Sequence, residues 1–219
     1  MKPSEYARVF AFVVAFLFIF GFVVPTAISL LTQQVEPFQA EGYPVEIDGH
    51  VYGSYLLAEA FNSSIFFHPR PSAIGYNLSQ SGSYPYSPGN PELTNLTIKY
   101  IEEFLEENPG VNVSQIPYAM VSYSASGLDP DIPVQGAYLQ IPRVSTNLSL
   151  LLSNTSLHMS RREASAYLYG LVNSSVQQNF PLFGTYYVNV VWLNVQIIKL
   201  LMDAGIVGPA SLSSGRFTS

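Results

Sequence analysis

Residues 9–31 read VFAFVVAFLFIFGFVVPTAISLL, a run of 23 residues without a charged side chain. An α-helix that crosses the hydrocarbon core of a bilayer needs about 20 such residues. Gly21 and Pro25 lie inside the run, and both residue types are tolerated in membrane helices. The run is longer than the apolar region of a cleavable signal peptide, which spans about 7–15 residues. We therefore predict that residues 9–31 form an uncleaved transmembrane helix.

The charges that flank this run predict its orientation. Lys2 and Arg8 precede it, and no basic residue follows until Arg70. Because Lys and Arg are enriched on the cytoplasmic side of membrane helices, we expect residues 1–8 in the cytoplasm and the main domain outside. The chain would then be a single-pass protein of the cell membrane. The expected downstream segments are a linker, one extracytoplasmic domain and a flexible C-terminal tail, at residues 32–43, 44–205 and 206–219 respectively.

The composition excludes several classes of function. The sequence has no cysteine, which excludes disulfides and thiolate metal sites. Its formal net charge of −6 at pH 7 argues against nucleic acid as a partner. The three histidines lack a metal-ligand spacing, and no Gly-x-x-x-x-Gly-Lys loop for phosphate is present. Ser72 and Ser126 have no nearby base to activate them. We therefore expect no metal site, no directly bound cofactor and no catalytic residue.

The chain is rich in acceptor motifs for N-glycosylation. It has seven Asn-X-Ser/Thr motifs after the apolar run, whereas its Asn, Ser and Thr content predicts about two by chance. This excess indicates a glycoprotein whose domain faces outside, typical of an archaeon or a eukaryote rather than of most bacteria. The alternative is that a chain rich in Ser and Asn forms such motifs without use. The candidate acceptors are Asn62, Asn77, Asn95, Asn112, Asn147, Asn154 and Asn173.

Periodicity and turn signals predict an α+β domain with a small sheet and several short helices. Asp48-Gly49 predicts a hairpin over residues 44–61, whose second strand continues to Leu57. Residues 69–91 have no periodicity, and a loop of this length is more often functional or interfacial than inert. The other expected strands are Ile116–Tyr123 and Tyr187–Leu193. The expected helices are one capped by Asn90 and ended by Asn108-Pro109-Gly110, one over residues 134–151 kinked at Pro142, one over residues 160–172 opened by a Ser160–Glu163 capping box, and one over residues 195–202 that stops at Gly205.

Six short segments carry a resemblance to a known family. They are Tyr52-Gly53-Ser54, Arg70-Pro71-Ser72-Ala73, Gly89-Asn90-Pro91-Glu92-Leu93, Ser124-Ala125-Ser126-Gly127-Leu128-Asp129, Gln140-Ile141-Pro142-Arg143-Val144 and Val188-Asn189-Val190-Val191-Trp192-Leu193-Asn194. Each segment alone is weak. Taken in this order after one apolar segment, they resemble the C subunit of the potassium-transporting P-type ATPases, the KdpC family. The resemblance covers residues 1–202, with departures at Ala58-Glu59, at residues 82–86 and at Pro133.

The resemblance implies an accessory subunit of an ATP-driven potassium-uptake complex, which stabilises assembly and supports transport. The implied partners are a channel-like potassium-translocating subunit, an ATP-hydrolysing P-type subunit, a small membrane peptide and the lipid bilayer. A chaperone-like role that raises the ATP affinity of the hydrolysing subunit has been proposed for the family. The expected outside location argues against direct ATP contact, so the complex would handle ATP and K⁺. Without the resemblance, the alternative is a membrane-anchored, glycosylated extracytoplasmic binding or envelope protein.

The motif residues are expected either to contact partners or to support the structure. Arg70 lies between two prolines, and its planar fork of donors suits a partner subunit, a lipid head group or an internal carboxylate such as Asp129. Asp129 and Asp131 are expected to bind backbone amides in a turn or to cap a helix, with a cation site as the alternative, and Arg143 is expected to pair with one of them. Four glutamates at positions 102, 103, 106 and 107 predict a solvated helix face, or one that concentrates cations. The full set of candidate site residues is His68, Arg70, Ser72, Asn90, Ser126, Gly127, Asp129, Gln140 and Arg143.

Overall fold

The computed structural model describes residues 3–180 and 184–207. The chain divides into two compact units, Met1–Pro44 and Val45–Ser219. The expected flexible tail at residues 206–219 lies, from residue 208 onward, outside the described residues.

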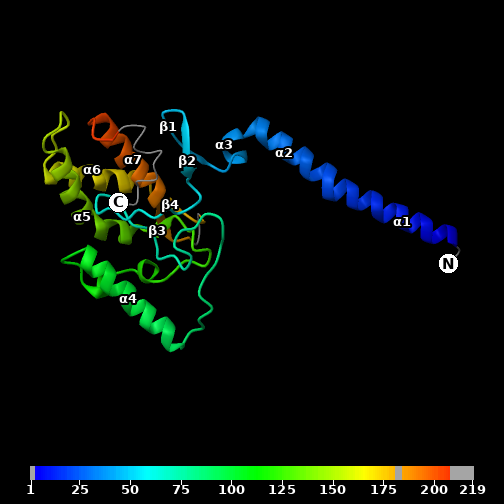
Figure 1. Ribbon diagram of the computed structural model, residues 1–219, viewed down its shortest axis with the longest axis horizontal. Helices are drawn as coiled ribbons and strands as arrows, with labels where there is room; N and C mark the ends of the chain where they lie inside the picture. Colours follow the sequence, from blue (N-terminus) through cyan, green and yellow to red (C-terminus); the bar gives the residue numbers. More distant parts are fainter. Residues whose placement is uncertain (1–2, 181–183, 208–219) are drawn as a thin grey trace. The chain divides into compact units, whose positions relative to one another are not determined.

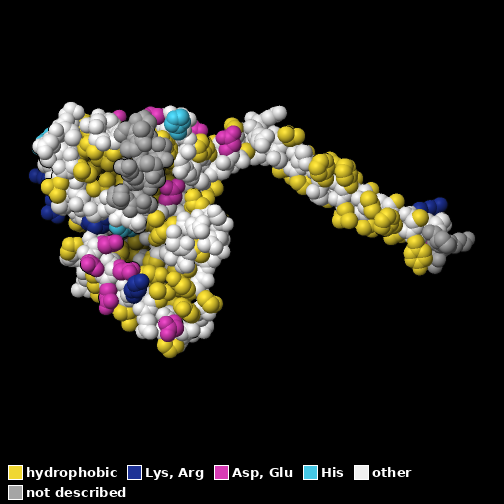
Figure 2. All heavy atoms as spheres, in the orientation of Figure 1, with side chains coloured by type: hydrophobic (Ala, Val, Ile, Leu, Met, Phe, Trp, Pro, Cys, Tyr) yellow, Lys and Arg dark blue, Asp and Glu magenta, His cyan; other side chains and the backbone are white. Residues whose placement is uncertain are grey.

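A long apolar helix forms most of the first unit (Figure 1). It consists of α1 (Pro3–Phe18), a π-helical turn (Ile19–Val23) and α2 (Val24–Val35), and it is followed by the short α3 (Pro37–Ala40). The stretch Ser4–Val35 is long and apolar enough to cross a membrane. None of the 18 consecutive residues with the highest mean hydropathy in this stretch is buried within the protein. Figure 2 shows hydrophobic side chains along its length. The helix therefore extends into the first part of the expected linker.

The second unit begins with the predicted hairpin. β1 (Pro44–Ile47) and β2 (His50–Ser54) pair with each other, and Asp48 and Gly49 join them with φ angles of 51° and 77°. Positive φ at both central residues is what an Asp-Gly turn supplies. The second strand is shorter than predicted, because the chain turns after Ser54, whose Oγ accepts a hydrogen bond from the Leu56 N–H.

A three-stranded antiparallel sheet lies further along the chain. It consists of β3 (Asp131–Pro133), β4 (Gln177–Gln178) and β5 (Tyr186–Asn189), in the order β3-β5-β4. The register pairs Ile132 with Val188, and both side chains are fully buried. This sheet therefore contributes one face to the core.

The predicted strand over residues 187–193 is right only for its first half. β5 ends at Asn189, whose Oδ1 accepts a hydrogen bond from the Trp192 N–H at 2.9 Å. This cap starts α7 (Val190–Asp203), so the apolar residues after Asn189 belong to a buried helix. A short run of apolar residues is compatible with both a buried strand and a buried helix, so periodicity alone does not distinguish them.

Three other helices complete the domain. They are α4 (Pro91–Glu107), α5 (Val134–Leu152) and α6 (Arg161–Ser174). The predicted caps at Asn90 and at Ser160–Glu163 are confirmed, and Pro142 lies inside α5 as expected. α5 packs against α6, and Figure 1 shows α4 apart from α6 and α7. The fully buried side chains from α5, α6, α7 and β3 include Ile132, Ile141, Val144, Leu148, Leu152, Leu168, Leu193 and Ile197.

The predicted strand over Ile116–Tyr123 is wrong. The chain there forms two short 3₁₀ helices, Val113–Gln115 and Tyr118–Val121. Met120 and Val121 are buried, so the apolar pattern reflects one buried side of a tight turn. α4 packs against the second of these 3₁₀ helices.

Candidate functional site

The segment from Phe66 to Ser72 has no regular secondary structure, and side chains from α5 and α7 hold its backbone. Asn194 accepts a hydrogen bond from the Phe67 N–H and donates one to the Phe67 carbonyl, both at 2.8 Å. Gln140 makes the same pair with His68, at 2.7 Å and 3.2 Å. Both amide side chains are fully buried. They satisfy the backbone groups that a neighbouring strand would otherwise satisfy.

Arg143 of α5 reaches the chain just before this segment. Its Nη1 donates to the carbonyls of Ser64 and Phe66, each at 2.9 Å. Its Nη2 donates to Gln140 at 2.7 Å, and its Nε donates to Asn108 at 3.1 Å. Burial lowers the pKa of the guanidinium to about 10, although the nearby carboxylate of Glu107 opposes this shift.

The predicted pairing of Arg143 with Asp129 or Asp131 is therefore wrong. The guanidinium points into the domain toward backbone carbonyls and amide side chains. Spacing along the sequence placed Arg143 on the correct helix, but it could not show which face of α5 the side chain would occupy. Pro142 lies inside this helix next to Arg143, and because a proline inside a helix commonly bends it, the face is harder to predict.

Arg70 makes the internal ion pair that was one of its two interpretations. Its Nη1 lies 2.8 Å from Asp129 Oδ2, and its Nε donates to the Ala119 carbonyl at 3.2 Å. Its Nη2 donates to the Tyr123 carbonyl at 3.4 Å. The Arg70 carbonyl in turn accepts a hydrogen bond from the Tyr76 hydroxyl. Every guanidinium nitrogen of Arg70 is thus engaged within the domain.

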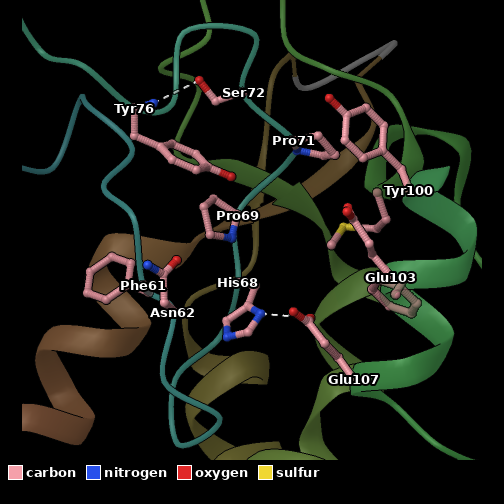
Figure 3. A pocket seen from close by; sticks show the side chains of 12 residues that line it. Phe61, Asn62, His68, Pro69, Pro71, Ser72, Tyr76, Tyr100, Glu103 and Glu107 are labelled. Carbon is pink, nitrogen blue, oxygen red and sulfur yellow. Dashed lines mark hydrogen bonds and ion pairs between the residues drawn. The ribbon is translucent and has the colours of Figure 1, made fainter. Parts of the chain in front are cut away.

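The Ser126-Gly127 turn docks against the same segment. The Ser72 hydroxyl donates to the Gly127 carbonyl at 2.7 Å and accepts from the Tyr76 N–H at 3.0 Å, the latter contact drawn in Figure 3. The Ser126 hydroxyl accepts from the next residue but one, Leu128. Gly127 has φ of +73°, and a Cβ there would lie 2.5 Å from Ile74. Glycine is therefore required for both its backbone angle and its lack of a side chain.

The two aspartates near this turn behave differently. Asp129 Oδ1 accepts a hydrogen bond from the Asp131 N–H at 3.0 Å, as the turn interpretation predicts. Burial first, and then the charge of Asp129, raise the pKa of Asp131 from 3.8 to about 6, although a hydrogen bond with Asn189 opposes them. Because the folded state binds this proton more tightly than the unfolded state, the contribution to stability is full below about pH 4 and is lost as the pH rises through about 6.

A cavity of about 330 Å³ lies between this segment and α4 (Figure 3). His68 and Glu107 line it, and their side chains meet at 2.8 Å. Burial disfavours the Glu107 carboxylate, but the hydrogen bond from His68 and the charges of His68 and Arg143 outweigh it, so its pKa lies below the ordinary value. The four glutamates are exposed, as expected for a solvated helix face, and Glu107 is in addition paired with His68.

The structure brings together all of the candidate site residues except Asn90, which caps α4. Among the described residues, no buried side-chain nitrogen or oxygen lacks a hydrogen-bond partner, and no group of three acidic, histidine or cysteine side chains could hold a metal ion. Sequence reasoning missed Asn194 and Asn108 as members of this network. The signal for Asn194 was a polar residue within a run of apolar helix positions, where burial forces it to find partners.

The Arg70–Asp129 ion pair predicts a measurable coupling. In the purified protein, Arg70→Lys and Asp129→Asn should each lower the free energy of unfolding by about 1–2 kcal/mol, because a partly buried charged hydrogen bond is lost. The double variant should cost clearly less than the sum of the two. The matched control is the exposed Lys99–Glu103 pair on α4, for which the coupling should stay below about 0.5 kcal/mol. Additive losses at Arg70 and Asp129 would show that the pair contributes no coupling.

Comparison with known proteins places this network in a family. A family model described as the K⁺-transporting ATPase c chain, KdpC, matches residues 6–199, which include every candidate site residue. The chain belongs to the KdpC family. KdpC subunits of potassium-transporting ATPases are similar to it over nearly their whole length. The protein from Thermoplasma acidophilum is 61% identical over 209 residues, covering 95% of this chain and 100% of the relative.

Two further KdpC relatives show the range of identity. The Thermoplasma volcanium protein is 64% identical over 192 residues, covering 88% of this chain and 90% of the relative. The Caldanaerobacter subterraneus protein is 34% identical over 197 residues, covering 90% and 95%. The resemblance drawn from the six motifs is thus confirmed, and the alternative of an unrelated envelope or binding protein is not favoured.

Proposed function

We propose that this KdpC chain is a non-catalytic accessory subunit that supports the assembly of a potassium-transporting P-type ATPase. Membership of the KdpC family carries the proposal. The contacts of the motif residues support a non-catalytic role, because Arg70, Gln140 and Arg143 bind backbone and side chains of their own domain. In this account the motif residues keep the domain in shape, and the chain hydrolyses no ATP by itself.

The proposed partners are a channel-like potassium-translocating subunit, an ATP-hydrolysing P-type subunit and a small membrane peptide. In this proposal these subunits, and not the present chain, bind K⁺ and ATP. The helix Ser4–Val35 supports a contact within the bilayer, because its apolar surface has no partner within its own chain over the window of highest hydropathy. An anchor of this kind also keeps the domain at high effective concentration beside the membrane subunits.

N-glycosylation of this chain and an archaeal source stay predictions, and the exposure of the asparagines supports a choice among the seven acceptors. Six of the seven asparagines are exposed. Asn147 differs, because it lies within α5, is partly buried and donates its Nδ2 to the Arg143 carbonyl at 2.9 Å. The glycan would have to replace that contact at the same nitrogen atom. We propose the other six asparagines as acceptors, at positions 62, 77, 95, 112, 154 and 173.

The proposed orientation, with the N-terminus inside and the domain outside, has a direct test. The chain has no cysteine, so single cysteines report one position each. We choose Ser4→Cys in α1 and Ser87→Cys in the exposed loop before α4. An impermeant thiol reagent should label Ser87→Cys on intact cells, and Ser4→Cys only after permeabilisation. Labelling of Ser4→Cys alone on intact cells would reverse the orientation and remove the external role.

A further inference from the structure

The His68–Glu107 contact lies where two cavities of the domain meet. The first is the cavity of about 330 Å³ between α4 and the segment from Phe66 to Ser72, which is called the His68 segment below. The second, of about 750 Å³, lies beside the C-terminal end of α4 and is also lined by α5 and α6. Asn62, His68 and Glu107 line both cavities. Figure 3 shows the His68 ring and the Glu107 carboxylate directed toward each other from the two sides.

Both ring nitrogens of His68 face hydrogen-bond acceptors. Nδ1 lies 2.8 Å from Glu107 Oε2, and an ionised carboxylate can only accept. Nε2 lies 3.2 Å from the Ser63 carbonyl, which also only accepts. A neutral imidazole carries one N–H and can satisfy one of these two acceptors, whereas the protonated ring satisfies both. The surroundings of the ring therefore match its protonated form.

When the ring is neutral and Nε2 carries no proton, Arg143 does not donate a full hydrogen bond to that nitrogen. Its Nη1 lies 3.4 Å from His68 Nε2, but it already donates to the Ser64 and Phe66 carbonyls at 2.9 Å. Its two N–H groups are thus taken by shorter hydrogen bonds. The guanidinium of Arg143 lies on one side of the His68 ring and the carboxylate of Glu107 on the other.

The other groups around His68 set the electrostatic balance. From α4, Glu103 lines the first cavity and Glu106 the second, so both add negative charge near the ring. From α6, Arg161 lines the second cavity and adds positive charge. The remaining ionisable groups that line the two cavities are the phenols of Tyr76, Tyr100, Tyr138 and Tyr169. The two cavities are therefore lined by three carboxylates and two guanidinium groups, which leaves an excess of negative charge around the His68–Glu107 contact.

We propose that proton binding to His68 fastens the C-terminal end of α4 to the His68 segment, as a pH-sensitive contact of this domain. When the ring is protonated, it bridges Glu107 of α4 and Ser63 of the loop. When the ring is neutral, one of the two hydrogen bonds is lost and the contact with Glu107 no longer joins opposite charges, so α4 is held less tightly and the two cavities that His68 and Glu107 line can join. Histidine is suited to this role because it titrates between about pH 5 and 8.

Hydrogen exchange of the full chain in detergent micelles tests the proposal. The measured quantity is the protection of amides in residues 101–107, corrected for the intrinsic effect of pH and compared with α7 in the same sample. Protection should fall about tenfold between pH 5 and pH 8, the effect of losing one charged hydrogen bond. Protection falls rather than rises with pH because a contact that the proton strengthens is complete at low pH and is lost as the pH rises.

Two variants and one control separate this contact from other titrations. Glu107→Gln and His68→Gln should each give the same protection of residues 101–107 at pH 5 and pH 8. His50→Gln, at an exposed position in β2, should keep the wild-type pH dependence. A wild-type protein without pH dependence would overturn the proposal. So would a Glu107→Gln or His68→Gln protein that keeps the full tenfold change.

Discussion

Replacing Arg143 by Met should lower the free energy of unfolding by about 3–5 kcal/mol, the largest loss of stability that we expect from one substitution. Methionine replaces the aliphatic part of the arginine side chain but not its guanidinium group, so most of the loss comes from the missing hydrogen bonds. The buried carbonyl of Phe66 and the buried side chain of Asn108 would lose their donor, and so would the part-buried carbonyl of Ser64. Each buried acceptor left without a partner costs about 1–3 kcal/mol.

Chemical denaturation of the purified protein, followed by a signal from Trp192 in α7, measures this effect. Arg162→Met is the matched control, because Arg162 is exposed on α6 and its loss should change the stability by no more than about 0.5 kcal/mol. Arg143→Lys should recover only a small part of the loss, because one ammonium group cannot reach donor positions on both sides of the fork. A midpoint for Arg143→Met that matches the control would mean that the buried network does not hold the domain together.

Local signals predicted much of the fold because they act over a few residues. The apolar run predicted the N-terminal helix, and Asp48-Gly49 predicted the hairpin turn. Asn90 and Ser160 predicted where two helices begin, since a cap satisfies backbone N–H groups next to it in the sequence. Each of these features depends on residues that are close together in the chain, so a single sequence contains enough information to predict them.

The elements that failed depend on contacts distant in sequence. Apolar residues after Asn189 could form a strand or a helix, and in the structure they form α7, whose apolar side chains are buried against the rest of the core. The stretch around Met120 is a tight turn whose one side meets α4, which periodicity does not reveal. Short apolar runs leave this choice open until burial settles it.

The candidate site shows the same division. The family motifs contain Arg70, Asp129 and Gln140, and Arg70 makes the internal ion pair with Asp129 that was one of its interpretations. The partners of Arg143 could not be predicted, because its hydrogen bonds go to backbone carbonyls that any residue type can supply. Side-chain identity at those positions carries no signal for such a contact.

The second large effect concerns the complex. Without this chain, potassium-stimulated ATP hydrolysis by the membrane complex should be lost or reduced at least tenfold, because an accessory subunit supports the assembly of the others. A chain that lacks residues 1–35 should be recovered with its partners in much smaller amounts, because it loses both helix packing in the bilayer and its anchor. The variant Arg162→Met, changed only at the exposed surface, should behave as the wild type in the same assay.

The most direct test of the central claim is purification of the tagged chain from native membranes in a gentle detergent, followed by an assay of ATP hydrolysis. The proposed accessory role predicts that two larger membrane proteins elute with it, that the material hydrolyses ATP faster when K⁺ is added, and that the isolated chain hydrolyses none. Recovery of the chain as a lone monomer from membranes that contain the transporter, or ATP hydrolysis by the isolated chain, would contradict the account.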